Sequence, residues 1–265
     1  MLNQFINKQW LNPESLNKVY KKNKPYPHIV MEDFFHNNMI EKVLKEFPDL
    51  SKKSKDKIKH FNNEIEKKFA SNDIDVLSPS AFELISFLNS EYFLKYLQKL
   101  TGIKELLISD PYLSGGGYHE IKQGGVLKIH ADFNKHPEIN IDRRLNLLIY
   151  LNKNWDEKWG GDFQMFDKNM NGPLKKVYPH FNTCVIFTTT SHTFHGHPEP
   201  LMCPNNKSRK SIALYYFSSG RPQSESNKIH STIFRERKNE SFDTKSKLKI
   251  IIKTKIKNFL SNLLR

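Results

Sequence analysis

The sequence predicts an α+β protein in which helices come first and a β-rich part follows. Helix signals occur before residue 102, and short apolar or alternating runs recur at close spacing over residues 103–220. Glycine pairs and a glycine triplet separate these runs. Many short strands without intervening helices are typical of an antiparallel sandwich, jelly roll or barrel, and they argue against a parallel α/β sheet.

The first part, residues 1–102, is predicted to be a helical support for the sheet. After a polar leader, we expect a proline-bounded strand over residues 24–35 and a short helix over residues 38–47 that Pro48 ends. Residues 51–68 carry seven lysines, and we expect them to form a linker.

Two further helices in this part have recognisable ends. Ser78 followed by Pro79 is typical of an N-cap and a first helical residue. Ser90 is expected to cap the next helix, residues 91–100, which Gly102 ends.

The second part, residues 103–222, is predicted to be the β-rich core. Its candidate strands share a short length, apolar or alternating character and flanking turn residues. They are Leu106–Ile108, Val126–Ile129, Leu145–Leu151, Asp162–Phe166, Cys184–Thr188 and Ser211–Phe217.

Positive charge is concentrated in two segments. Lys and Arg outnumber Asp and Glu by 42 to 28, giving a net charge of +14. Residues 228–265 carry +8 and residues 51–68 carry +4, which leaves +2 for the remainder. A nucleic-acid-binding face needs basic groups across the fold and aromatic rings that stack on bases. We therefore expect no nucleic-acid partner, and dealkylation of nucleic acid is disfavoured.

The third part, residues 223–265, is predicted to be a basic tail with an amphipathic helix over Thr244–Arg265. Apolar residues recur there at helical spacing, and most lysines lie off that stripe. Such a helix docks either on its own domain or on an anionic membrane surface or a partner protein, and both interpretations stay open. The sequence predicts no particular oligomeric state.

Composition also limits the location and any metal site. No apolar run approaches the roughly 18 to 20 residues that span a bilayer, and the first residues lack signal-peptide features. Cys184 and Cys203 are too few for a disulfide framework or a zinc-ribbon site. We expect a cytoplasmic protein whose metal ligands, if any, are histidine and carboxylate.

One short motif carries most of the chemical information. On a strand, residues two apart point to the same face, so His130 and Asp132 can bind one ion from one side. A third ligand is expected downstream, where an apolar strand is followed by three histidines: His192, His195 and His197. Two histidines and one carboxylate that leave open coordination positions are typical of non-haem Fe(II) oxygenases, whereas zinc prefers a tetrahedral set.

Residues 112–222 resemble the prolyl 4-hydroxylase-like branch of the Fe(II)/2-oxoglutarate-dependent dioxygenases. The resemblance rests on the order of five motifs, namely His130-x-Asp132, the strand Arg144–Asn152, the turn Trp159–Asp162, Phe194–Gly196 and Ser208–Ser211. It implies a double-stranded β-helix (jelly-roll) core, with the N-terminal helices as its support and a C-terminal helix after it. It also implies Fe(II) and 2-oxoglutarate, with ascorbate as an accessory reductant.

The resemblance assigns the metal ligands one by one. His130, Asp132 and His195 match the iron ligands, because His195 follows an aromatic residue as the distal histidine of the family does. His192 and His197 are the competing candidates.

The resemblance also assigns a co-substrate pocket. Arg209 matches the basic residue that pairs with the distal carboxylate of 2-oxoglutarate, and Ser211 shares its face. Tyr150 matches a tyrosine that donates a hydrogen bond to the same carboxylate. Either Tyr118 or His119 matches a tyrosine that the family often places before the first histidine ligand.

The implied activity is hydroxylation of an unactivated C–H bond, with a prolyl or other protein side chain as the first choice of substrate. A free amino acid, a glycan precursor or a small metabolite stays open. A non-catalytic cupin-like binding module is the alternative from another class, and the intact Arg209 argues against it.

Overall fold

The computed structural model describes residues 1–225, 228–244, 246, 248 and 252. In this part of the chain the helices precede most of the strands, as an α+β fold requires. The α-helices are α1 (Leu2–Phe5), α2 (Pro13–Lys22), α3 (Asn37–Glu46), α4 (Pro79–Leu88) and α5 (Glu91–Thr101).

The strands form one antiparallel sheet that curves into a barrel. Their bounds are β1 (His28–Met31), β2 (Lys59–Asn62), β3 (Glu66–Ser71), β4 (Ile108–Ser109), β5 (Gly117–Ile121), β6 (Val126–Ala131), β7 (Asp142–Tyr150), β8 (Phe163–Phe166), β9 (Lys175–Val177), β10 (Thr183–Thr188), β11 (Phe194–His197), β12 (Arg209–Ser218) and β13 (Ile233–Phe234).

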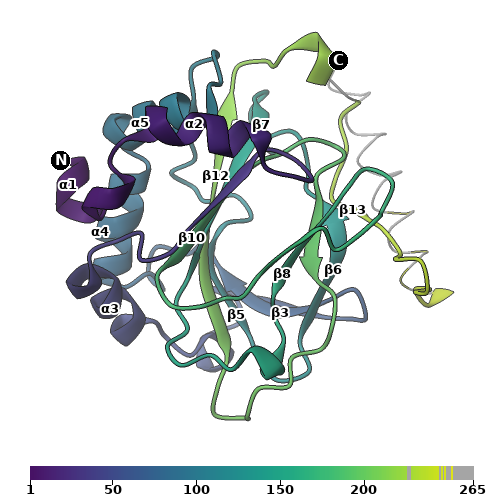
Figure 1. Cartoon of the computed structure of the whole chain (residues 1–265). Helices are drawn as coiled ribbons and strands as arrows, with labels where there is room; N and C mark the ends of the chain where they lie inside the picture. The colour runs from purple at the N-terminus through teal and green to yellow at the C-terminus, as the bar shows by residue number, and fades with distance from the viewer. Residues whose placement is uncertain (226–227, 245, 247, 249–251, 253–265) are drawn as a thin grey trace.

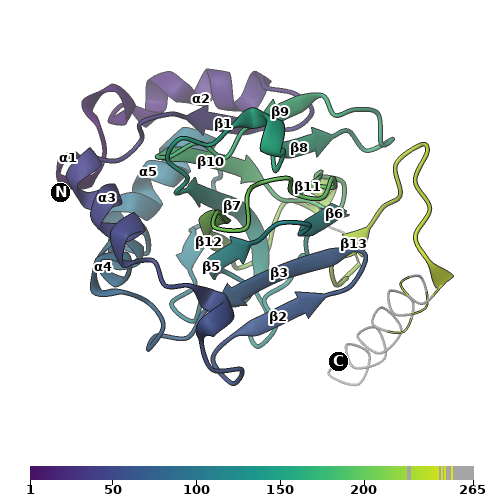
Figure 2. The same cartoon turned by 90° about the horizontal axis from the view of Figure 1, so that it is seen from below.

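Strand β3 joins the two layers of the barrel. The larger layer has the order β1-β10-β7-β12-β5-β3, and the smaller layer continues as β6-β11-β8-β9. The end of β3 near Ser71 pairs with β5, whereas its beginning at Glu66 and Lys67 pairs with β6. One strand therefore links the layers, and Figure 2 shows it along one side of the barrel with β2 outside it.

The helices cover the outer face of the larger layer (Figure 1). Leu147 of β7, Ile186 of β10 and Leu214 of β12 are buried in the same apolar cluster as Leu88 and Leu97 of the helices. Because side chains alternate along a strand, the residues between these positions point into the barrel. These inward-facing positions carry apolar side chains such as Val185 and Phe187 as well as polar groups such as Asn146.

Most of the expected elements are present. The helix expected over residues 38–47 is α3, and the helices that begin after Ser78 and Ser90 are α4 and α5. Each of the six candidate strands of the core overlaps an observed strand. Ser78 caps α4, since its side chain accepts a hydrogen bond from the Ala81 amide.

Two expectations about the first hundred residues are wrong. Residues 51–68 are not a linker throughout, because β2 and the first half of β3 lie there. Lysine is depleted in strands, so composition hides an edge strand whose lysines stay in water. Ser90 makes no side-chain cap: its hydroxyl donates instead to the Phe87 carbonyl at the end of α4.

The C-terminal part is only partly described. Its residues 233–234 form β13, which pairs with β6 and so joins the sheet. The amphipathic helix expected over residues 244–265 lies mostly outside the described residues, so it stays a prediction. Within the described ranges, no helix combines the length and apolar character that crossing a bilayer requires.

The two serines at helix starts give a matched test of capping. Ser78→Ala is expected to lower the free energy of unfolding by about 1 to 2 kcal/mol, since it removes the cap and a hydrogen bond with the Tyr118 hydroxyl. Ser90→Ala is expected to cost less, because α5 loses no cap. Urea denaturation followed by circular dichroism measures both, and equal losses would contradict this assignment.

Candidate active site

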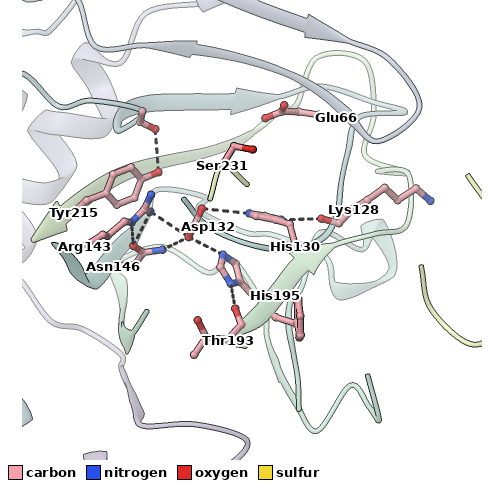
Figure 3. Close-up of polar contacts among 12 residues, drawn as sticks. Glu66, Lys128, His130, Asp132, Arg143, Asn146, Thr193, His195, Tyr215 and Ser231 are labelled. Carbon is pink, nitrogen blue, oxygen red and sulfur yellow. Dashed lines mark hydrogen bonds and ion pairs between the residues drawn. The ribbon is translucent and has the colours of Figure 1, made fainter. Parts of the chain in front are cut away.

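His130, Asp132 and His195 meet at one point inside the barrel. His130 of β6 lies directly opposite His195 of β11, and Asp132 follows the end of β6. One potential ligand atom from each residue lies within 4.8 Å of the others. His195 Nε2 is 3.3 Å from Asp132 Oδ2, and His130 Nε2 is 3.6 Å from Oδ1. Figure 3 shows the three side chains pointing toward one another. We call them the His-Asp-His cluster.

Backbone carbonyls orient both imidazoles. His130 Nδ1 is 2.8 Å from the Lys128 carbonyl oxygen, and His195 Nδ1 is 2.9 Å from the Thr193 carbonyl oxygen. A carbonyl oxygen only accepts, so each Nδ1 carries the proton and each Nε2 keeps a lone pair toward the cluster. This arrangement, with one ring nitrogen held by the backbone, is typical of metal-binding histidines.

Asp132 is held as an anion by groups from β7. Asn146 Nδ2 donates to Asp132 Oδ2 over 2.7 Å, and the Arg143 guanidinium lies 3.1 Å from the same oxygen. Burial alone would raise the pKa of Asp132, but Arg143 and then His195 outweigh burial and hold this pKa well below its ordinary value. Both donors engage Oδ2, so Oδ1 keeps its lone pairs for a cation.

The position of Arg143 depends on a bulge in β7. Tyr216 of β12 faces Leu145, but the next residue of β12 faces Arg143, so Arg144 is an extra residue in β7. Residues three apart on a regular strand face opposite sides, and a bulge puts Arg143 and Asn146 on the same side. Arg143 then donates to the Asn146 side-chain oxygen (Figure 3).

Two aromatic rings enclose the Arg143 guanidinium. Its central carbon lies 3.4 Å from the ring centre of Tyr215 and 4.4 Å from that of Phe133. The Arg143 side chain is fully buried. Stacking on aromatic faces suits the planar guanidinium and not a lysine ammonium. The cation that balances Asp132 is therefore fixed by packing as well as by charge.

A cavity of about 340 Å³ extends from the His-Asp-His cluster to Arg209. Tyr150, Ser211 and His119 line it from three adjacent strands, because Ser211 pairs with Tyr150 on one side and with His119 on the other. Directly paired residues share a face of the sheet. The cavity is of the size of small ligand sites, which start at roughly 300 Å³.

Arg209 is a buried cation aimed into this cavity. Its Nε donates to the Gly161 carbonyl, 2.8 Å away, and one terminal nitrogen donates to the Tyr150 hydroxyl at 3.3 Å. Burial raises the pKa of Tyr150 despite Arg209, so this phenol keeps its proton. Among the described residues, no carboxylate forms an ion pair with Arg209. A buried guanidinium in this setting fits a carboxylate ligand.

The lining of the cavity shows which of the expected site residues face it. Tyr118 does not face it: the ring is buried in the apolar core, and its hydroxyl bonds with Ser78. The expectation for Tyr118 is wrong, because a shift of one residue along a strand reverses the face. His119 lines the cavity instead. Of the competing histidines, His192 is exposed, and His197 lines the cavity outside the cluster.

The chain after the core also reaches the cluster. Strand β13 pairs with the end of β6, so that Phe234 faces His130, and their ring centres are 5.4 Å apart. Ser231, Thr232 and Phe234 line the cavity together with β2 and β3. No apolar periodicity marks this segment, so sequence reasoning missed it.

Comparison with known proteins agrees with this geometry. Residues 116–217 match the family model of the 2OG-Fe(II) oxygenase superfamily. The matched region contains the cluster, Tyr150 and Arg209. This part of the chain is a 2OG-Fe(II) oxygenase domain, and the protein is a dioxygenase that uses Fe(II) and 2-oxoglutarate.

Solved structures show the same fold at low sequence identity. A prolyl hydroxylase from Trichoplax adhaerens, in complex with a hypoxia inducible factor peptide fragment, is 18% identical, with a TM-score of 0.56 over 79% of this chain and 92% of that chain. A Pseudomonas putida prolyl-4-hydroxylase is 12% identical, with a TM-score of 0.54 over 79% and 100%. HygX from Streptomyces hygroscopicus, with nickel and 2-oxoglutarate bound, is 12% identical, with a TM-score of 0.51 over 84% and 96%.

These likenesses confirm the double-stranded β-helix core that the sequence predicts. A search of curated proteins gives no significant match.

The Arg143–Asp132 pair gives a test of the buried charge. Arg143→Met is expected to lower the free energy of unfolding by about 3 to 5 kcal/mol at pH 7, because a buried carboxylate loses its partner. Adding Asp132→Asn is expected to recover part of this loss, because no charge is then unpaired. Chemical denaturation of the metal-free wild type and the two variants measures these changes.

The same pair has a pH dependence of known sign. A carboxyl whose pKa is depressed by folding stabilises the protein above its unfolded-state pKa, and this stabilisation is lost as the pH falls through the folded-state pKa. The stability gap between wild type and Arg143→Met should therefore be widest near pH 7 and shrink below the ordinary value of 3.8. A gap that grows on acidification would contradict the assignment.

Proposed function

We propose that the protein hydroxylates an aliphatic C–H bond in a prolyl or other protein side chain. The observation that carries the proposal is one cavity with the His-Asp-His cluster at one point of its wall and the buried Arg209 at another. A metal site and a carboxylate site in one cavity are what a chelating dicarboxylate co-substrate needs.

In this proposal the cluster holds Fe(II). Two imidazole Nε2 atoms and one carboxylate oxygen form the donor set that non-haem iron enzymes use, and they leave positions for a chelating ligand and oxygen. Bound Fe(II) supplies the oxidation chemistry that hydroxylates a C–H bond with 2-oxoglutarate as co-substrate. The chain itself fixes the ligand geometry, since backbone carbonyls orient both histidines and Arg143 with Asn146 orients Asp132.

Arg209 and Tyr150 are the proposed anchors of the co-substrate. The guanidinium can donate to both oxygens of a carboxylate, and the protonated Tyr150 hydroxyl can donate to one of them. Ser211 lies beside Tyr150 on the same face and adds a hydroxyl. Anchoring one end of the co-substrate leaves its 2-oxo acid end toward the cluster.

A protein substrate is supported by the residues at the cavity mouth. The lining residues that are exposed or half-buried include Lys59, Asn63, Asn72 and Thr232, from the β2–β3 hairpin and the chain before β13. Amide, hydroxyl and ammonium groups at a mouth can bond with a peptide backbone while one side chain enters the cavity. The Trichoplax structure holds a peptide fragment on the same fold.

One observation favours a free amino acid as the second candidate. Glu66 and Lys68 of β3 line the cavity as an ion pair of 3.0 Å, with side chains 17% and 10% exposed. Together they offer an acceptor for an ammonium group and a donor for a carboxylate. A substrate panel that contains free amino acids and short prolyl peptides separates the two candidates by substrate-dependent succinate formation.

Removing any member of the cluster is expected to abolish turnover. Alanine at His130, Asp132 or His195 should reduce bound Fe(II) below stoichiometric levels and stop succinate formation, because each supplies one of three ligands. Alanine at His192 is the control, since that side chain is exposed outside the cluster. Iron content and succinate are measured for all four. Near wild-type activity in any cluster variant would remove that residue from the metal site.

Removing Arg209 is expected to separate co-substrate binding from metal binding. Arg209→Ala should weaken 2-oxoglutarate by about a hundredfold or more, which corresponds to roughly 3 kcal/mol, because the carboxylate loses its cation in a buried site. Fe(II) affinity should change little. Calorimetric titration under anaerobic conditions measures both, and unchanged 2-oxoglutarate affinity would assign the anchor to another residue.

A further inference from the structure

His197 is a buried polar side chain that the proposed chemistry does not use. It is 3% exposed on β11, and neither Nδ1 nor Nε2 has a hydrogen-bond partner in the structure. Leaving a buried polar group without a hydrogen-bond partner is energetically unfavourable. The ring lines the cavity, so a ligand in the cavity can supply the missing partner.

The backbone fixes where this ring lies. His197 pairs with Leu127 of β6, and a Cβ added at the preceding Gly196 would lie 2.6 Å from the Leu127 carbonyl oxygen. Strands β11 and β6 are therefore pressed together at this point, and the His197 ring is held in the cavity wall. Burial first, and then the positive charges of Arg209 and Lys68, hold the pKa of His197 well below its ordinary value.

This placement puts His197 in the wall of the cavity that also contains the carboxylate anchor and the metal cluster. It is outside the group of atoms that lie within 4.8 Å of one another, so it is not a fourth member of the cluster. The space between Arg209 and the cluster is where a co-substrate held at both ends must lie.

We propose that His197 binds the co-substrate by donating one ring N–H to the distal carboxylate of 2-oxoglutarate, beside Arg209. The proposal rests on the function proposed above. An imidazole carries at least one N–H in either protonation state, and a carboxylate is an acceptor with room for several donors. His197 would thus add a third side-chain donor to the guanidinium of Arg209 and the hydroxyl of Tyr150.

His119 differs from His197 in one respect that matters here. Its Nε2 also has no partner, but its ring bonds with the backbone at Gly115. A ring nitrogen that donates to a carbonyl leaves the other nitrogen of the neutral ring as an acceptor. A neutral His119 therefore suits a hydroxyl donor such as Ser211 on the adjacent strand, and a carboxylate suits His197.

The test removes the donor from the protein and the carboxylate from the ligand. His197→Leu introduces an apolar side chain of moderate size, and His197→Asn keeps a hydrogen-bond donor. His192→Leu is the matched control at an exposed position. Each protein is loaded with Mn(II), which avoids turnover, and titrated calorimetrically with 2-oxoglutarate and with 2-oxopentanoate. The second ligand has the same chain length and 2-oxo acid end but no distal carboxylate.

His197→Leu is expected to weaken 2-oxoglutarate by about tenfold and to leave Mn(II) and 2-oxopentanoate within about twofold of wild type. His197→Asn should restore part of the lost affinity, and His192→Leu should match wild type. Circular dichroism verifies that each variant is folded. If His197→Leu does not fold, the affinities of His197→Asn for the two ligands decide the question.

Two results would overturn the proposal. Unchanged 2-oxoglutarate affinity in His197→Leu would show that the ring makes no contact with the co-substrate. Equal weakening of both ligands would place its effect at the 2-oxo acid end or in packing. If the wild-type protein binds Mn(II) but neither ligand, the proposed function fails, which is a distinct outcome from a selective failure at His197.

Discussion

The ion pair between Arg143 and Asp132 is the interaction on which the rest of the site depends. A largely buried carboxylate beside two imidazoles would lose its charge to desolvation if nothing balanced it. Arg143 balances the charge from a position that water cannot reach, because Tyr215 and Phe133 enclose it. The anion is therefore held by the chain's own groups, and the Nε2 atoms of both imidazoles lie close to its oxygens. Fixing ligands in advance limits the entropy that metal binding must remove.

The closure of the sheet decides what the cavity contains. Strand β3 pairs with both layers, so its inward-facing side chains become part of the cavity wall. Those side chains include Glu66 and Lys68. Composition alone places both residues in a basic linker. The charges at positions 66 and 68 thus line the cavity in this fold, while neighbouring lysines such as Lys67 stay exposed.

Strand geometry indicated that His130 and Asp132 act together, whereas the family resemblance assigned His195 and the proposed co-substrate anchor Arg209. His130 and Asp132 share a face, and Arg209 and Ser211 share another, so a period of two brings each pair together. Arg143 escaped prediction because a bulge at Arg144 breaks that period in β7. The choice between Tyr118 and His119 needed the register of β5 against β12, which no local pattern contains. His197 was considered only as a competing ligand, because its distance from the cluster depends on strand pairing.

The return of the chain at β13 gives the metal centre an unusual dependence on residues far along the sequence. Phe234 lies against the ring of His130, and its strand occupies the edge of β6 beside this histidine. An uncovered edge there would offer unpaired backbone groups to solvent next to a metal-binding position. Residues after 222 therefore border the His-Asp-His cluster through the pairing of β13 with β6. A fragment that ends at β12 would keep all three potential metal ligands. It would lose Phe234, whose ring covers the ring of His130.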